Sequence, residues 1–262
     1  MAVRHLSERL VCTCSLVSDG LILADIGTDH AYLPIECCRS GRTPSAIAAD
    51  VRPGPLSRAR AHVEEAHLED RITCRLSDGF SAIAPGEVQS AVITGMGGLL
   101  ICDILRRGVD TVNTLQELIL GPQSEQEEVR RCVTGMGFVI DREEMVEEDR
   151  KFYVLIRFRR RNKPDVVSGS AAERRSDAVT ASDGEGDGLT PEETAFGPYL
   201  LEHRNPVLFR FLGRRQMVLE GLLRGLSERR EQESLSPAAE KRYSEIKEEL
   251  RLIATAQKRY EK

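Results

Sequence analysis

Short apolar runs alternate with amphipathic stretches between residues 21 and 160, at the spacing of βα units. The apolar runs are LILAD at 21–25, SAIAAD at 45–50, ITCRL at 72–76, SAVIT at 90–94 and ELIL at 117–120. Helical patterns follow at 53–66, 98–107 and 124–134. Near-continuous apolar runs are typical of strands buried on both sides, so the alternation predicts a parallel sheet with helices on both faces.

The series of βα units ends at residue 138. FVIDREEMVEED at 138–149 is followed directly by RKFYVLIRFRR at 150–160, with no helical pattern between the two segments. This order predicts a long antiparallel hairpin. Five parallel strands followed by such a hairpin are the layout of the Rossmann-like class I methyltransferases, whereas dinucleotide dehydrogenases usually end in another βα unit. We therefore predict an α/β fold of the methyltransferase type.

The rest of the chain has a different composition. Residues 161–190 are rich in Ser, Asp, Gly and Ala and nearly lack large apolar residues, which predicts a disordered acidic linker. Two apolar stripes at helical spacing follow, and SLSP at 234–237 offers a Ser cap and a Pro in the first turn of the second helix. The stripes consist of Leu208, Leu212, Leu219, Leu222 and Leu226, then Tyr243, Ile246, Leu250 and Ile253. We expect an α/β domain at 1–160, the linker at 161–190 and an α-helical coiled-coil hairpin at 191–262.

Composition narrows the class of protein. Apolar residues make up 40% of the 262 positions and charged residues 30%, which excludes collagen-like, wholly disordered and disulfide-scaffold classes. No apolar stretch approaches the ~20 residues that span a bilayer, so we expect a soluble, cytoplasmic protein. Seven Cys without a C-x-x-C pair favour free, buried thiols over a metal site.

Charge is distributed unevenly along the chain. Residues 1–160 carry 19 Lys and Arg against 24 Asp and Glu, whereas residues 201–262 carry 14 against 10. The C-terminal part is therefore basic, and a polyanionic partner would meet it first, although so small an excess is also typical of a solvated helix.

The most informative residues follow the predicted strands, because ligands of open α/β sheets bind at the carboxyl edge. The first strand leads into Asp25-Ile26-Gly27-Thr28-Asp29-His30-Ala31-Tyr32. A dinucleotide loop needs G-x-G-x-x-G, whereas this loop has one Gly and two carboxylates. Carboxylates repel a pyrophosphate but suit the ammonium group of S-adenosylmethionine. An alternative is that Asp29 only caps the following helix, and that His30 and Tyr32 serve the helix start and the core.

Carboxylates also follow the second and third strands. Asp50, next to Val51, lies about 20 residues after the glycine turn, where Rossmann-like sites bind ribose hydroxyls. Ser77-Asp78-Gly79-Phe80 follows the third strand, where Asp78 could accept a hydrogen bond from an adenine amine and Phe80 could pack on the ring. Each is an ordinary turn sequence by itself, but acids after three successive strands together predict a nucleoside site.

The fourth strand ends in Thr94-Gly95-Met96-Gly97-Gly98. Many amino-methylating enzymes carry an acid or Asn, two Pro and an aromatic residue here, and this chain has neither. The glycines would leave room for a bulky base beside the methyl group, or they serve only a tight turn.

These residues resemble the bacterial tRNA (adenine-22-N1)-methyltransferases, the TrmK family. DIGTDHAYLP, SDGF, ITGMGG, LILGPQ, EEMVEEDRKFYVLIRF and FGPYLLEHRNPVLFRFL carry the resemblance, which runs from about Leu6 to the end except for 161–190. It implies an N-terminal S-adenosylmethionine-binding domain and a C-terminal coiled coil that helps to hold tRNA. The chain departs from the family at Gly121-Pro122-Gln123, where the family has Gln-Pro-Asn, and in its long acidic insertion.

We accordingly predict transfer of a methyl group from S-adenosylmethionine to N1 of adenine-22 in tRNA, without a metal. N1 is itself a lone-pair nucleophile, so positioning would supply most of the catalysis. Predicted catalytic residues are Asp29, Tyr32, Gly95 and Met96. Predicted cofactor-binding residues are Asp25, Gly27, Thr28, Asp29, His30, Asp50, Val51, Ser77, Asp78, Gly79, Phe80, Thr94, Gly95, Met96 and Gly97. Predicted RNA-binding residues are Arg210, Arg214, Arg215, Arg224, Lys241, Arg242 and Lys247.

Two other functions fit parts of the sequence. A methyltransferase of the same fold acting on a small molecule or a protein would have no use for a basic coiled coil. A catalytically silent RNA-binding protein would leave the carboxylates after three strands without a role.

Overall fold

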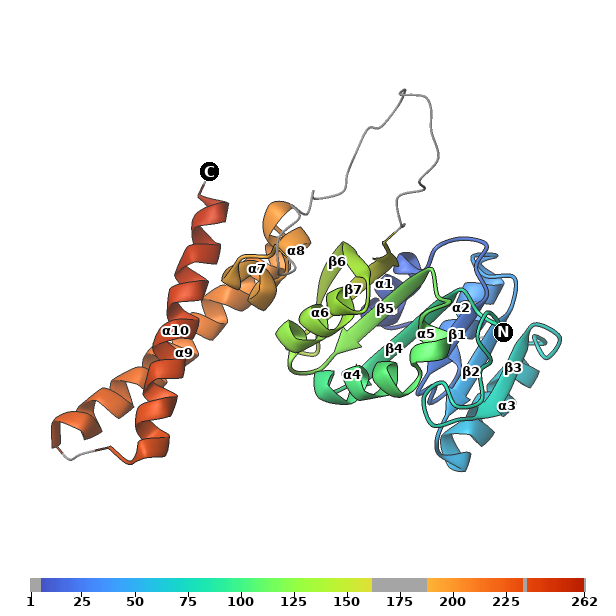
Figure 1. Cartoon of the computed structure of the whole chain (residues 1–262), viewed down its shortest axis with the longest axis horizontal. Helices are drawn as coiled ribbons and strands as arrows, with labels where there is room; N and C mark the ends of the chain where they lie inside the picture. Colours follow the sequence, from blue (N-terminus) through green and yellow to red (C-terminus); the bar gives the residue numbers. More distant parts are fainter. Residues whose placement is uncertain (1–5, 162–187, 233–234, 262) are drawn as a thin grey trace, which may run out of the picture. The chain divides into compact units, whose positions relative to one another are not determined.

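Seven strands form one sheet in the order β3-β2-β1-β4-β5-β7-β6 in the computed structural model (Figure 1). The structure describes residues 6–161, 188–232 and 235–261. The strands are β1 (Leu23–Ile26), β2 (Ala46–Asp50), β3 (Ile72–Leu76), β4 (Ser90–Met96), β5 (Glu117–Pro122), β6 (Phe138–Glu148) and β7 (Lys151–Arg160). Strands β1 to β5 pair in parallel, and β7 pairs antiparallel with both β5 and β6. The predicted methyltransferase-type sheet and its terminal hairpin are confirmed.

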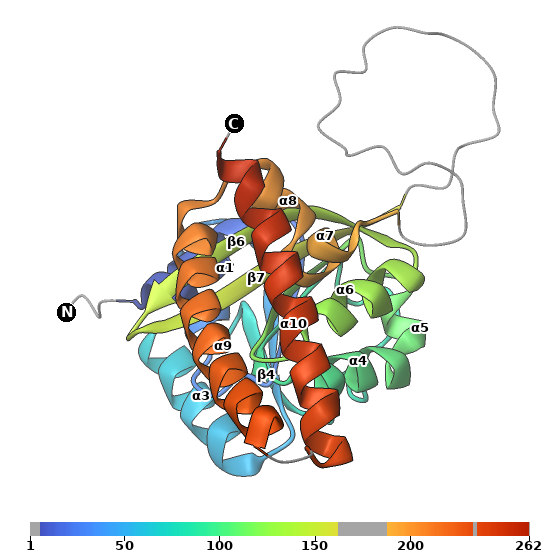
Figure 2. The same ribbon diagram turned by 90° about the vertical axis from the view of Figure 1, so that its left-hand side faces the viewer.

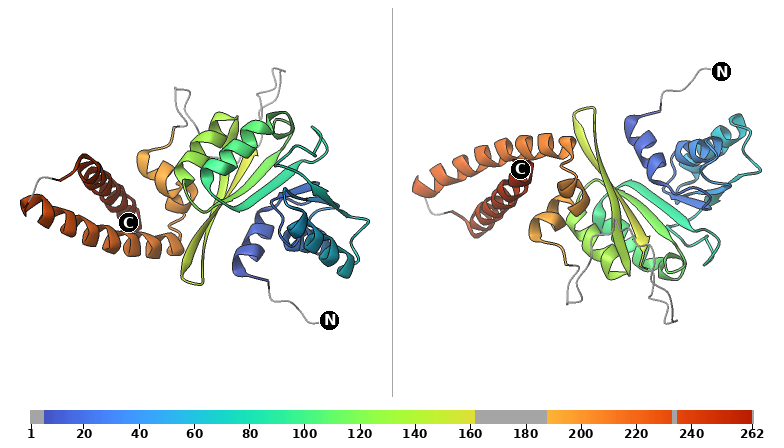
Figure 3. Two further views of the ribbon diagram at one scale, coloured as in Figure 1. Left: turned by 90° about the horizontal axis from the view of Figure 1, so that it is seen from below. Right: turned by 90° about the horizontal axis from the view of Figure 1, so that it is seen from above.

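Helices cover both faces of this sheet, as Figure 3 shows, with the blue helices on one face and the green helices on the other. They are α1 (Glu8–Leu16), α2 (Tyr32–Arg39), α3 (Pro53–Glu65), α4 (Gly98–Arg107), α5 (Val109–Val112) and α6 (Gln126–Gly135). Buried side chains form one cluster that includes α1, α2 and α3 and a second that includes α4 and α6. The sheet is therefore buried on both sides, which explains the uninterrupted apolar runs of β1, β2 and β5.

Local backbone chemistry sets several boundaries. Helix α6 begins at Gln126, two residues later than predicted, because Glu125 has a left-handed φ of 49°. Asp149 and Arg150 at the β6–β7 turn also have positive φ values, of 49° and 63°, which suit the twist of a two-residue hairpin turn. Helix α1 is absent from the sequence-based expectations, although Ser7 accepts a hydrogen bond from Leu10 N at 3.2 Å and caps it.

The second compact unit, from Gly188 onwards, is helical. It contains α7 (Pro191–Phe196), α8 (Pro198–Glu202), α9 (Pro206–Gln232), α10 (Pro237–Gln257) and the short 3₁₀ helix η1 (Lys258–Tyr260). Helices α9 and α10 lie side by side and run in opposite directions (Figure 2). Ser236 accepts from Ala239 N at 3.3 Å, so the predicted cap of the second helix is confirmed.

The expected leucine stripe of α9 is only partly buried. Leu208, Leu212 and Leu219 are buried, but the side chain of Leu222 is 48% exposed, so its predicted place in the helix interface is wrong. The coiled-coil packing itself stays a prediction. The linker predicted at 161–190 lies, apart from its ends, outside the described residues. Among the described helices, none is long and apolar enough to cross a membrane.

Candidate functional site

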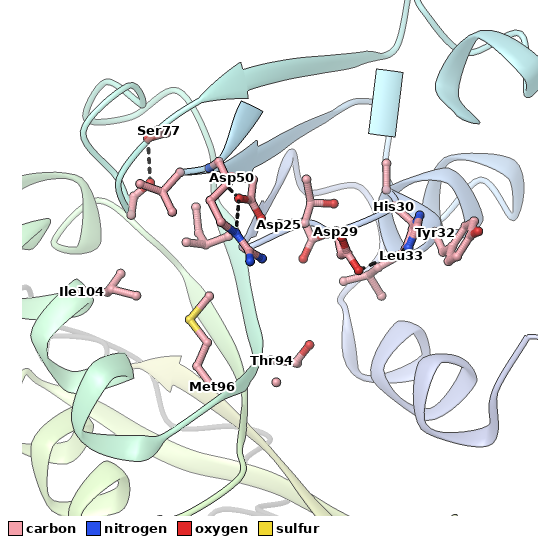
Figure 4. Close-up of a pocket in the computed structure, with 18 of the residues that line it drawn as sticks. Asp25, Asp29, His30, Tyr32, Leu33, Asp50, Ser77, Thr94, Met96 and Ile104 are labelled. Atoms are coloured by element: carbon pink, nitrogen blue, oxygen red, sulfur yellow. Dashed lines mark hydrogen bonds and ion pairs between the residues drawn. The ribbon is translucent and has the colours of Figure 1, made fainter. Parts of the chain in front are cut away.

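A pocket of about 600 Å³ lies at the carboxyl ends of the central strands (Figure 4). Its volume falls in the range of small-molecule and cofactor sites. The structure brings the following predicted residues to its walls: Asp25, Gly27, Thr28, Asp29, His30, Tyr32, Asp50, Val51, Ser77, Asp78, Gly79, Thr94, Gly95 and Met96. Phe80 and Gly97 are not among the lining residues.

Asp25 is one of two buried acids that line the pocket, the other being Asp50. Asp25 ends up inside because β1 is covered on both faces, and 8% of the residue is exposed. Burial disfavours the charged carboxylate and raises its pKa to about 6, and the nearby charge of Asp50 acts in the same direction. A cation placed beside Asp25 would reverse this effect, so the pocket favours a positively charged ligand group.

Gly27 turns the chain away from the sheet directly after β1. Its φ of +82° is a conformation that other residues rarely adopt, and a Cβ atom here would collide with the side-chain methyl of Met96. The amides of Gly27 and Thr28 both donate to Ala49 O, at 2.8 and 2.9 Å. The glycine therefore allows the loop and the end of β4 to approach each other at the pocket.

Asp50 ends β2 with one carboxylate oxygen committed. Its Oδ1 accepts from Arg52 N at 2.8 Å, and 4% of the residue is exposed. Within the described part of the chain, Oδ2 has no hydrogen-bond partner. Asp50 is thus fixed by its own turn, with one oxygen available to accept from vicinal hydroxyls of a ribose.

The turn after β3 holds a more exposed carboxylate. Ser77 Oγ donates to Gly79 O at 2.8 Å and shapes the turn, while Arg107 of α4 donates to both oxygens of Asp78, at 2.7 and 3.2 Å. Arg107 lowers the pKa of Asp78, which stays ionised. The predicted ring contact of Phe80 is wrong: this side chain is 4% exposed and packs in the core beside Gly108, where a Cβ atom would not fit.

The glycine-rich corner after β4 contains an irregularity in the sheet. The register between β4 and β5 shifts between Thr94 and Met96, and Gly95 between them has a φ of +80°. Gly97 precedes α4 and lies near Ser124, outside the pocket lining, and its predicted ligand contact stays a prediction. Gln123 N donates to Met96 O at 2.8 Å, which ties the strand end that departs from the family to this corner.

Asp29, His30 and Tyr32 line the end of the pocket away from Met96 (Figure 4). The alternative of Asp29 as a helix cap is wrong, because α2 starts at Tyr32 and its N-cap is Ala31, with a φ of 56° and no side-chain cap bond. Asp29 Oδ2 instead lies 3.2 Å from His30 Nε2, and the His30 and Tyr32 rings stack at 5.1 Å. This loop therefore keeps its shape through side-chain contacts.

The sequence pattern does not indicate the pocket residues that come from outside the strand ends. Arg9, Leu10 and Thr13 line it from α1, and Leu100 and Ile104 line it from α4. The Ser cap and amphipathic spacing of residues 7–16 are signals for the helix, but nothing in the sequence shows that it reaches the pocket.

Two further features bear on which ligand the pocket could hold. Arg9 has no acidic partner among the described residues; its guanidinium lies 4.7 Å from the centre of the Tyr153 ring. Among the residues that the structure describes, no group of three or more His, Cys, Asp or Glu is placed to hold a metal. The other arginine that lines the pocket, Arg52, lies 3.7 Å from Asp50 Oδ1, so Arg9 is the better candidate to meet an anionic ligand group.

Comparison with known proteins agrees with this architecture. A methyltransferase domain family matches residues 6–156. The tRNA (adenine(22)-N(1))-methyltransferase of Bacillus subtilis is 30% identical over 205 residues, covering 78% of this chain and 79% of that protein. Streptococcus pneumoniae Sp1610, solved in complex with S-adenosyl-L-methionine, has a similar structure: the TM-score is 0.76 at 28% identity, covering 96% of this chain and 99% of that one.

A second solved structure is similar over the same share of the chain. The B. subtilis M1A22 tRNA methyltransferase TrmK superposes with a TM-score of 0.78 at 25% identity, covering 96% of this chain and 98% of that one. The match therefore includes both the sheet and the C-terminal helices. With the family model, the 30% identity and the shared architecture together, the chain belongs to the tRNA (adenine(22)-N(1))-methyltransferase family, TrmK.

Proposed function

We propose that this protein transfers a methyl group from S-adenosylmethionine to N1 of adenine 22 in tRNA. The observation that carries the proposal is the meeting of Asp25, Asp50 and Asp78, from three successive strand ends, in one pocket beside the Gly95–Met96 corner. The activity for which the B. subtilis relative is named supplies the substrate and the position of the base.

The residues present fit S-adenosylmethionine. Asp50 Oδ2 would accept from the ribose hydroxyls, and the acids of the β1 loop, Asp25 and Asp29, would balance the ammonium group. Arg9, the lining cation without an acidic partner in the described chain, would bind the methionine carboxylate.

The adenine end of the cofactor would meet the opposite wall of the pocket. Leu100 and Ile104 offer an apolar surface for the adenine ring. Asp78 would accept from the adenine amine only by sharing its carboxylate with Arg107.

Positioning is the main catalytic task of these residues. Bound S-adenosylmethionine supplies a methyl group on a sulfonium, and N1 of a neutral adenine has the lone pair that accepts it as the S–C bond breaks. No protein group needs to remove a proton from N1. Gly95, which has no side chain, leaves space for the base at the strand end, and Met96 and Tyr32 would border the base on either side.

The helical unit would provide phosphate contacts. Its residues 201–262 carry 14 Lys and Arg against 10 Asp and Glu, whereas residues 1–160 are net acidic. The principal candidates are Arg210, Arg214 and Arg224, because all three are exposed on the side of α9 that faces away from its buried leucines. Since tRNA is the substrate, we place the activity in the cytoplasm.

The other predicted cations of this unit lie beside acidic or aromatic side chains. Arg215 pairs with Glu249 of α10 at 2.6 and 2.9 Å and so joins the two helices. Lys241 and Arg242 both lie beside Glu245, and Lys247 lies over the Tyr243 ring.

A methylation assay tests the function directly. Purified protein is incubated with tritiated S-adenosylmethionine and a tRNA transcript, and the digested nucleosides are separated. We expect 1-methyladenosine from a transcript with adenine 22 and none from a matched transcript with guanine at that position. An Asp50→Ala variant should bind the cofactor more weakly by about 1–3 kcal/mol, the size of a lost hydrogen bond to a charged group. Asp19→Ala is the control, because that carboxylate is exposed and pairs with Arg42 at the surface.

Other results would favour the alternatives. Cofactor binding without tRNA methylation would support a methyltransferase for a small molecule or a protein. tRNA binding without cofactor binding would support a silent RNA-binding protein.

A further inference from the structure

Two side chains of α3, one helical turn apart, contact the loop between β1 and α2. Arg58 Nη2 donates to Asp29 Oδ1 at 2.5 Å, and His62 Nδ1 lies 3.0 Å from His30 O. A carbonyl oxygen can only accept, so Nδ1 of His62 carries the hydrogen. The two contacts fall on consecutive loop residues, because residues four apart project from the same face of a helix.

Aromatic contacts also join α3 to this loop. The His62 ring stacks on Tyr32 with centroids 4.9 Å apart and an interplanar angle of 24°, and it lies 5.3 Å from the His30 ring. His30 and Tyr32 also stack on each other. The three rings therefore form one cluster, in which His62 is the member that does not line the pocket.

The loop has little support of its own. Its first amides, Gly27 and Thr28, bond to Ala49 O, but the amides of Asp29, His30 and Ala31 donate to no backbone carbonyl among the described residues. Ala31 is held at a φ of 56°, which disfavours a residue with a Cβ, and no side chain caps α2. The contacts from α3 therefore add to the Asp29–His30 pair and the His30–Tyr32 stack in holding residues 29–31 in this conformation.

We propose that Arg58 and His62 are positioning residues for methyl transfer, which hold Asp29 and the 29–32 loop in the shape that the cofactor and the target base require. This inference rests on the proposed function, because the role of Asp29 does. Arg58 and Asp29 are 50% and 55% exposed, so their ion pair contributes little to folding stability and its effect should appear in activity.

A double-mutant cycle separates positioning from simple charge effects. We expect Arg58→Ala to lower kcat/KM for tRNA methylation about tenfold and Arg58→Lys to restore part of the loss. In an Asp29→Asn background, Arg58→Ala should change kcat/KM less than twofold, because Arg58 acts through that carboxylate. Arg60→Ala is the matched control, since it removes the same charge from an exposed position of the same helix. Thermal unfolding of all variants should stay near that of the wild type.

Substitutions of His62 separate its hydrogen bond to His30 O from its ring contact with Tyr32. His62→Asn keeps a donor near the position of Nδ1, whereas His62→Ala keeps neither the donor nor the ring. We expect Ala to lose about tenfold in kcat/KM and Asn to retain most of the activity.

Two results would overturn the proposal that Arg58 and His62 position the 29–32 loop. One is wild-type activity in His62→Ala, and the other is an Arg58→Ala change that is equally harmful with and without the Asp29 carboxylate. A wild type that binds S-adenosylmethionine but methylates no tRNA would instead overturn the proposed function, and calorimetry of cofactor binding would then test the same variants.

Discussion

Arg130 of α6 and Glu143 of β6 form an ion pair inside the protein: Arg130 Nε donates to Glu143 Oε1 at 2.9 Å, and the side chains are 1% and 0% exposed. Two buried charges are tolerated only while each neutralises the other. The pair joins a helix that begins at the pocket edge of the sheet to the outer strand of the hairpin.

Removing one partner of this pair should be costly. We expect Glu143→Ala to lower the free energy of unfolding by about 3–5 kcal/mol, because the Arg130 charge would remain buried without its partner. Replacing both residues together, by Arg130→Met and Glu143→Leu, should cost less than the single change. Denaturation by urea measures both variants, and Glu144→Ala is the control, since Glu144 pairs with Arg142 nearer the surface. A loss below about 1 kcal/mol for Glu143→Ala would contradict the prediction.

The strands can be predicted from the sequence because a strand that is buried on both faces is apolar at nearly every position, as at 117–120. The acids of the pocket can be predicted for a related reason: Asp25, Asp50 and Asp78 each follow such a run, and parallel strands bring their ends to one edge. The parallel topology of the sheet therefore brings together three acids that are far apart in the sequence.

Contacts between side chains of distant segments produce no such pattern in the sequence. Arg130 and Glu143 lie in stretches as polar as those of exposed residues, and Arg107 reaches Asp78 from a helix 29 residues further along the chain. The SDG turn predicts Phe80 in the pocket, but the chain folds this residue back under Gly108. Which way a side chain points after a turn depends on tertiary packing, and the sequence pattern does not contain it.

The pH dependence of cofactor binding should report on Asp25. Burial raises its pKa from 3.8 to about 6, so between about pH 4 and 6 the folded protein holds this proton more tightly than the unfolded chain. The contribution of Asp25 to stability therefore falls as pH rises through this window. A cationic ligand group prefers the ionised carboxylate, so the affinity for S-adenosylmethionine should fall as pH is lowered from 7 to 5.

Calorimetry at several pH values measures this effect. An Asp25→Asn variant, which cannot ionise, should bind more weakly at pH 7 and lose the dependence on pH. Asp29→Asn is the matched control, because Arg58 lowers the pKa of Asp29 and keeps it ionised across the same range. A wild-type affinity that is constant between pH 5 and 7 would exclude Asp25 from this role.

Cys132 should be the most reactive of the partly exposed thiols. The hydrogen bond from Cys102 and the nearby Arg106 guanidinium lower the pKa of Cys132, whereas burial raises the pKa of Cys12 to about 11. The thiolate is the reactive form, so iodoacetamide at pH 7.5 should label Cys132 before Cys12. Mass spectrometry of the digested protein measures both sites. Cys102→Ala should slow the labelling of Cys132, and equal rates at Cys132 and Cys12 would contradict the assignment.

The outer face of α9, formed by Arg210, Arg214 and Arg224, should provide the salt-sensitive part of tRNA binding. At 3.6 residues per turn these arginines fall on one side of the helix, opposite its buried leucines. Replacing all three by Gln should weaken tRNA binding and reduce the slope of log K against log salt by about 0.9 for each phosphate that the variant no longer neutralises. The affinity for S-adenosylmethionine should not change, because its pocket is lined by the other unit.

Arg215→Gln is the matched control for this triple variant. It removes the same charge from the same helix, but Arg215 pairs with Glu249 of α10, so the salt slope should stay unaltered. Filter binding of tRNA at several salt concentrations measures the slope for each protein. An unchanged slope in the triple variant would show that the phosphates are bound elsewhere, because a cation that neutralises a phosphate releases counterions and must therefore contribute to the salt dependence.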